Sequence, residues 1–184
     1  MPHIHTQPNQ HDHTVSAYIV RDDGNEPRML LHMHKKLGML LPVGGHIELD
    51  ETPWAAVAHE LEEESGYAIE DLSVMQPHLR IKQAEYEHIV VHPQPVLMNT
   101  HLVSDEHYHS DTGYLFLAHA GPTRALAAGE STDLRWLTSR EIAALTSEEI
   151  WQRVQRICLE TLDVFMNEWE AVATTEFSSD KLRP

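Results

Sequence analysis

The stretch from Gly45 to Gly66 constrains the fold most, because a glycine loop runs there into a helix with clear start and stop signals. Thr52 is a favourable N-cap residue, and Pro53 suits the first helical position. Gly66 stands where the C-terminus of a helix favours a left-handed residue. The sequence therefore predicts a helix that begins near Pro53 and ends before Gly66.

Three glutamates of this predicted helix share one face. Glu60, Glu63 and Glu64 stand at positions i, i+3 and i+4. Clustered like charges oppose folding without a counterion, and hard divalent cations prefer oxygen ligands. An acidic run is usually a solvated helix face. Here the run follows a glycine loop that lets backbone carbonyls approach the same point, and this combination favours a metal site.

The stretch resembles the Nudix box, whose pattern is Gly, five residues, Glu, seven residues, Arg-Glu, an aliphatic, any residue, Glu-Glu, any residue, Gly and an aliphatic. The positions that match are Gly45, Glu51, Glu60, Leu61, Glu63, Glu64 and Gly66. The sequence departs from the pattern at His59, where the family has arginine, and mildly at Tyr67, where an aliphatic is usual. With its flanks, the resemblance spans about residues 14–145.

The resemblance implies an α/β fold, a Nudix-type α/β/α sandwich with a mixed β-sheet. It also implies a pyrophosphohydrolase that cleaves a nucleoside diphosphate linked to another group, with Mg²⁺ or Mn²⁺ as cofactor. The implied catalytic and metal-binding carboxylates are Glu60, Glu63 and Glu64, joined by the backbone carbonyl of Gly44 or Gly45. Glu51 would hold the box loop against the helix. Many members recruit a later carboxylate, for which Glu130 is the first candidate and Asp133 the second.

His59 replaces the arginine that orients the box glutamates in the family. Histidine is shorter and lacks the bidentate fork of arginine. We therefore expect lower activity, or an acid-shifted pH optimum, compared with His59→Arg. His59 is also the one feature that favours an alternative from another class, a Nudix-like module that senses a nucleotide or sugar nucleotide without turnover. The intact carboxylate set favours the hydrolase.

The chain has fifteen histidines, which invites a zinc hypothesis. The groups along the sequence are His3/His5/His11/His13, His32/His34 and His101/His107/His109. None shows the ligand spacing typical of a structural zinc site. His107 and His109 are expected on the surface more than at the substrate. His46, beside the glycine loop, is the candidate to approach substrate phosphate.

We expect residues 1–13 to form a flexible leader, residues 14–172 a single domain, and residues 173–184 a flexible tail. Hydrophobic patterning predicts a hairpin of residues 14–20 and 28–33, then strands at 40–45, 95–103, 113–119 and 135–137. A short helix at 139–145 precedes a long C-terminal helix within 147–170. The apolar face of that helix covers the sheet or also meets a partner subunit, so a homodimer is an open alternative. Cys158 lies on this face and is expected in the core, not as a nucleophile.

A formal net charge of −16 disfavours nucleic acid polymers and anionic membranes as partners. The absence of a long apolar run argues against a membrane span. The single cysteine fits a reducing cytoplasm. Bound divalent cations can invert the local charge, so a small, metal-chelated nucleotide is the expected partner.

Overall fold

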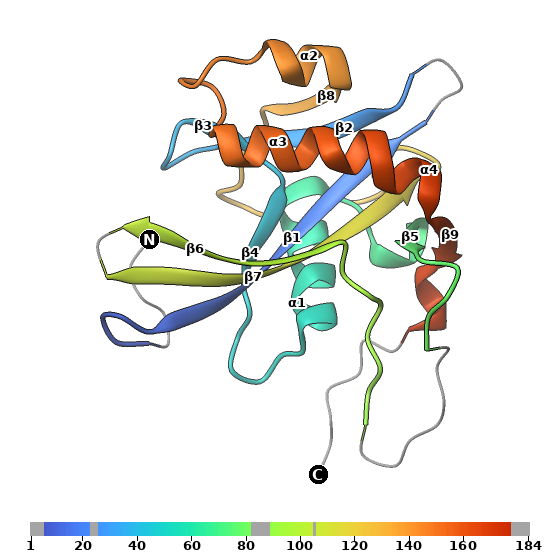
Figure 1. Cartoon of the computed structure of the whole chain (residues 1–184), viewed down its shortest axis with the longest axis horizontal. Helices are drawn as coiled ribbons and strands as arrows, with labels where there is room; N and C mark the ends of the chain where they lie inside the picture. Colours follow the sequence, from blue (N-terminus) through green and yellow to red (C-terminus); the bar gives the residue numbers. More distant parts are fainter. Residues whose placement is uncertain (1–5, 23–25, 82–88, 105, 178–184) are drawn as a thin grey trace.

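The computed structural model describes residues 6–22, 26–81, 89–104 and 106–177. Within this part of the chain, nine strands form one mixed sheet (Figure 1). They are β1 His11–Arg21, β2 Arg28–His34, β3 Met39–Leu41, β4 Val43–His46, β5 Leu72–Gln76, β6 Leu97–Ser104, β7 His107–Ala118, β8 Leu134–Thr138 and β9 Glu170–Ala173. The main order is β3-β2-β1-β7-β5-β9, with β4 paired to β1, β6 to β7 and β8 to β2. β1 and β7 run parallel, and the predicted hairpin of β1 and β2 is confirmed.

The longer helices interrupt their α-helical hydrogen bonding with π-helical turns. α1 (Pro53–Glu60) continues into a π turn at Leu61–Ser65. α2 spans Ser139–Ala144. α3 (Gln152–Glu160) continues through a π turn at Thr161–Phe165 into α4 (Met166–Glu168). Short 3₁₀ turns lie at Ile69–Asp71 and Thr174–Glu176.

Helices cover both faces of the sheet. Because successive side chains of a strand point to opposite faces, one strand contributes to the core on each side. Val15 and Ile19 of β1 join the core cluster that contains Trp54 of α1. Tyr18, from the same strand, joins the second cluster, which contains Cys158 of α3. Figure 1 shows α1 on one side of the sheet and α2 and α3 on the other. The predicted α/β/α sandwich is confirmed.

The N-terminal boundary of the fold differs from the prediction. β1 begins at His11, so His11 and His13 belong to a strand and not to a flexible leader. Asp12 is buried while both histidines are exposed. Because the residues of this segment are polar, the sequence does not show which side chains are buried and which are exposed. The segment forms a strand because β1 pairs with β7 along its full length. His3 and His5 lie outside the described residues.

The C-terminal helix is also shorter than predicted, with about 17 residues from Gln152 to Glu168. The Glu149 carboxylate accepts hydrogen bonds from the backbone N–H and hydroxyl of Thr146, both at 2.9 Å, but these bonds close a turn before the helix. Trp151 follows in an extended conformation and forms the N-cap. The described part of the predicted tail, residues 173–177, packs on the domain: Ala173 belongs to β9, which pairs with β5, and Thr174 is buried.

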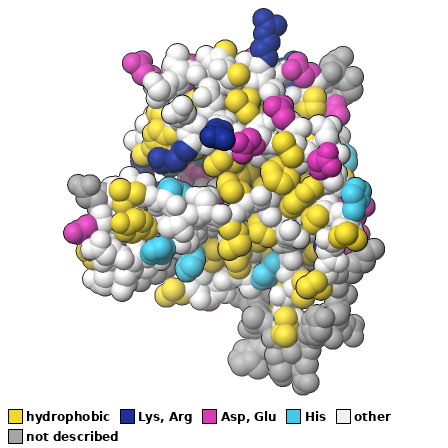
Figure 2. Space-filling view, in the orientation of Figure 1, with side chains coloured by type: hydrophobic (Ala, Val, Ile, Leu, Met, Phe, Trp, Pro, Cys, Tyr) yellow, Lys and Arg dark blue, Asp and Glu magenta, His cyan; other side chains and the backbone are white. Residues whose placement is uncertain are grey.

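The apolar face of α3 packs on the sheet as predicted. Cys158 is fully buried there, and burial raises the pKa of its thiol to about 12, which agrees with a core role. On the face shown in Figure 2, hydrophobic, basic and acidic side chains are interspersed. Among the described residues, no helix is long and apolar enough to cross a membrane.

Candidate active site

The box helix has the predicted start and stop, but its last turn is π-helical. The Thr52 hydroxyl accepts a hydrogen bond from the Ala55 N–H at 3.2 Å, and Pro53 occupies the first turn. Gly66 ends the helix with φ 73°, in the left-handed region. Single π turns are frequent at functional sites. This one carries Glu63 and Glu64, which follow Glu60 along the chain.

Two glycines of β4 bring its backbone against the box carboxylates. The Gly44 N–H donates to Glu64 Oε2 at 3.0 Å. A Cβ added to Gly45 would lie 2.1 Å from Glu60 Oε1, so this carboxylate packs directly on the glycine. A Cβ on Gly44 would lie 2.2 Å from the Val15 carbonyl oxygen of β1. Only glycines therefore allow β4 to lie between β1 and the helix.

Burial and neighbouring carboxylates raise the pKa of two glutamates of the box. Burial, helped by Glu64, raises the pKa of Glu60 to about 8. Burial also raises the pKa of Glu64 to about 7, although the Gly44 N–H opposes it. His32 Nε2 lies 3.5 Å from Glu64 Oε2, but burial lowers the pKa of His32 to about 4 and keeps the ring neutral. Part-buried carboxylates of this kind fit a hard divalent cation.

The structure brings Glu130 to the box. Glu130 lines a cavity of about 210 Å³ together with Glu64, and its charge raises the pKa of Glu60 and Glu64. The loop before it is tied to the box, since the Ala127 N–H donates to the Glu63 carbonyl at 2.9 Å. Asp133, the second candidate, forms a bidentate ion pair with Arg135 at 2.8 and 2.7 Å. Glu130 is therefore the better-placed residue.

His59 contacts two glutamates of the box. Its Nε2 lies 3.0 Å from Glu63 Oε1, and its Nδ1 lies 3.6 Å from Glu51 Oε1. Burial lowers the pKa of His59, but the nearby carboxylates, led by Glu63, outweigh it and leave the pKa raised. The ring therefore stands between these two carboxylates, and it can offer only one N–H to each.

A second cavity, of about 160 Å³, opens on the face of the sheet that α3 covers. Its wall includes Gly44 and Gly45, and His34 lines both cavities. Aliphatic side chains make up much of the rest, and the aromatic and polar residues among them include Tyr18, Asn99, Asp111, Trp151 and Arg153. This cavity was not predicted from the sequence. Trp54 and Phe116 do not line it, because they stack on each other in the core.

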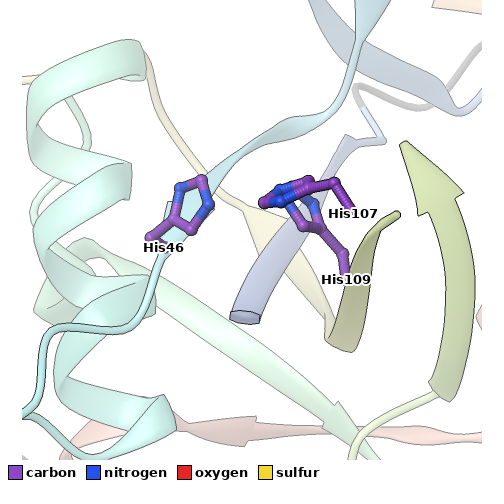
Figure 3. A group of neighbouring side chains, drawn as sticks. All are labelled: His46, His107 and His109. Carbon is purple, nitrogen blue, oxygen red and sulfur yellow. The ribbon is translucent and has the colours of Figure 1, made fainter. Parts of the chain in front are cut away.

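The prediction that His107 and His109 lie on the surface is wrong, because they are only 1% and 7% exposed. Both point into a cluster with His46, shown in Figure 3. Burial and the adjacent histidines, first His46, lower the pKa of His109 to about 3. The ring of His46, the residue predicted to approach substrate phosphate, lies 4.9 Å from that of His109, centroid to centroid. The His-x-His pair in a strand was the available signal, since such residues share a face.

The chain belongs to the NUDIX domain family, whose profile matches residues 10–156. A MutT-like protein from Streptomyces ambofaciens is 39% identical over 69 residues, which are 38% of this chain and 43% of that relative. The match thus spans less than half of the curated relative. The structure resembles a NUDIX-family hydrolase from Clostridium perfringens, with 27% identity, TM-score 0.66, and coverage of 84% of this chain and 98% of the other. It also resembles an Ap4A hydrolase from C. elegans, with 15% identity, TM-score 0.63, and coverage of 84% and 97%.

These findings confirm the family resemblance, and they support the prediction of a Nudix-type hydrolase. The likeness to the C. elegans enzyme concerns the fold, given the low identity.

Proposed function

We propose that this chain hydrolyses a phosphoanhydride bond in a nucleoside diphosphate linked to another group, with Mg²⁺ or Mn²⁺. The observation that carries the proposal is the packing of Glu60 and Glu64 against Gly45 and Gly44. Two part-buried, mutually repelling carboxylates beside the glycines of β4 are costly to maintain, and a divalent cation would offset that cost.

The residues that would hold the cation are Glu60, Glu63 and Glu64, with the backbone carbonyl of Gly44 or Gly45. The bound ion would neutralise charge that develops on the phosphates. Water would attack phosphorus, the bond to the leaving phosphate would break, and one carboxylate of the box or Glu130 would take the proton of the water. Glu51 and His59 would hold the orientation of the box through their contact with each other and with Glu63.

The two cavities suggest how the substrate lies. The cavity beside Glu64 and Glu130 also contains Lys35 and Lys36, whose charges suit phosphates. The cavity lined by Tyr18 and Trp151 offers an aromatic wall and polar groups that suit a nucleoside. Since His34 lines both, a nucleotide could extend from one to the other. The proposed location of the protein is the cytoplasm.

The test is turnover of a substrate panel by the full chain. Nucleoside triphosphates, nucleotide sugars and dinucleoside polyphosphates are incubated with Mg²⁺ or Mn²⁺, and phosphate products are followed. We expect metal-dependent turnover that Glu63→Gln abolishes. Glu62→Gln is the matched control, because Glu62 lies on the same turn but pairs with Arg124 at 2.7 Å.

A panel without any turnover would contradict the hydrolase. If ligands then stabilised the chain against heat, the nucleotide-sensing module would be the correct interpretation. The contact of His59 with Glu63 would then be the first candidate cause of the missing turnover.

A further inference from the structure

A cluster of imidazoles and one carboxylate lies where β1, β4 and β7 meet. In the register of the sheet, Asp12 stands opposite His109, and Thr14 stands opposite His46. His107 lies two residues before His109 on β7, so both side chains project from the same face. Figure 3 shows the rings of His46, His107 and His109 turned toward one another.

The spacing of these groups matches a coordination shell. One ring nitrogen from each of the three histidines lies within 4.8 Å of the other two. The closest pair, His107 Nε2 and His109 Nε2, is 3.0 Å apart. Asp12 Oδ2 lies 3.7 Å from His107 Nε2 and 3.9 Å from His46 Nε2. Ligands on a tetrahedral zinc ion stand roughly 3.3 Å apart, given zinc–nitrogen bonds of about 2.0–2.1 Å.

The carboxylate has the supporting contact that a metal ligand needs. The Thr6 hydroxyl donates to Asp12 Oδ1 at 2.6 Å. This bond fixes the carboxylate while its other oxygen, Oδ2, faces the histidines. Hydrogen bonds of this kind orient the ligands of protein metal sites. Asp12 and His107 are only 2% and 1% exposed, so a metal ion held between them would be shielded from water.

We propose that His46, His107, His109 and Asp12 form a structural site for a transition metal ion, with Zn²⁺ as the preferred ion. Imidazole ligands suit zinc, and four protein ligands leave no position for substrate. Mg²⁺ prefers six oxygen ligands, so the site discriminates against the ion proposed for the box. The metal would tie together three strands of the sheet. It would thereby fix the end of β4, where Gly45 immediately precedes His46.

Co²⁺ is the probe for this site, because its visible absorption is strong in four-coordinate and weak in six-coordinate surroundings. The full chain is freed of metal and titrated with Co²⁺, then with Zn²⁺, and thermal unfolding is followed. We expect strong bands that saturate at one equivalent and disappear when Zn²⁺ is added. Zn²⁺ at about 100 times its Kd should raise the Tm by roughly 5–10 °C. Mg²⁺ should produce neither effect.

Matched variants separate this site from other metal ligands of the chain. His107→Gln and His109→Gln should lose the bands and the Tm shift. Controls that should keep both are His119→Gln, Glu63→Gln and the double variant His3→Ala/His5→Ala. His119 follows β7, and its Nε2 contacts the Ser73 hydroxyl at 3.0 Å.

Unchanged bands in both glutamine variants would overturn the proposal, as would bands lost in the His3/His5 variant alone. If the glutamine variants do not fold, as judged by circular dichroism, Asp12→Asn decides. A fall in Zn²⁺ affinity of about tenfold or more supports the site, and unchanged affinity indicates a hydrogen-bonded histidine cluster without metal.

Discussion

The box carboxylates and the histidine cluster differ in how the chain assembles them. Glu60, Glu63 and Glu64 come from one helix, and their shared face follows from their spacing. Asp12, His46 and the His107/His109 pair come from three strands, and they meet only because β1 pairs with both β4 and β7. A group of residues on one helix can therefore be predicted from the sequence, whereas a group assembled from several strands depends on strand register.

The two regions also differ in chemistry. The box offers oxygen ligands, and the Glu63 side chain remains 44% exposed. The cluster offers imidazoles, and two of them, His107 and His109, are buried. We therefore assign turnover to the box and stability to the cluster.

The largest expected effect is on turnover. Glu64→Gln should lower kcat by about 10²- to 10³-fold, the usual cost of removing one group that stabilises the transition state. The same variant should unfold at an unchanged or higher temperature, because it removes a charge from a part-buried position. His107→Gln should show the converse, with kcat within about threefold of the parent and loss of the Zn²⁺-dependent Tm shift. Steady-state kinetics and calorimetry check both. A Glu64→Gln variant with the kcat of the parent would contradict the assignment of turnover to the box.

Alanine substitutions at Gly44 and Gly45 should have different effects on stability and on turnover. Gly44→Ala forces a Cβ to within 2.2 Å of the Val15 carbonyl, a backbone contact that cannot yield cheaply. Overpacking of this kind costs about 1–3 kcal/mol of unfolding free energy or more. Gly45→Ala instead meets the Glu60 carboxylate, the movable end of a side chain. Gly45→Ala should therefore lower kcat, with a smaller loss of unfolding free energy than Gly44→Ala. Urea denaturation alongside kinetics measures both, and equal stability losses would contradict this assignment.

His59→Arg should increase turnover several-fold, up to about tenfold. Arginine can donate to Glu51 and Glu63 at once through its fork, which the single ring of His59 does less well. The readout is kcat measured at saturating Mg²⁺, with His59→Gln as the neutral control. If kcat is the same in the parent and in His59→Arg, this position does not orient the box.

The smallest expected effects concern helix caps. Thr52→Ala removes the cap of α1, and Thr138→Ala removes the capping box that Thr138 forms with Glu141 at α2. Each should cost about 1 kcal/mol of unfolding free energy. Only Thr52→Ala should also lower kcat, because α1 leads into the box glutamates. Equal kinetic effects of the two variants would mean that turnover follows global stability.

Much of the fold could be predicted from local signals. The box helix, the β1–β2 hairpin and the short helix at residues 139–144 all carry caps, turns or alternation within a few residues. The start of β1 at His11 could not be predicted, because polar residues that serve a buried cluster resemble a polar leader. The turn before Trp151 could not be predicted either, since the Thr146 and Glu149 pair fits a helix start equally well.

The sequence by itself determined the carboxylate set, the glycines beside it and the departure at His59, because helix periodicity and backbone sterics act over short distances. Only the tertiary structure decided that Glu130 lines a cavity with Glu64 while Asp133 pairs with Arg135, and that a second cavity reaches Gly44 and Gly45. It also decided that His46, His107 and His109 meet at Asp12. The physical reason is that strand pairing joins residues far apart in the chain, and their proximity depends on a register that no local pattern encodes.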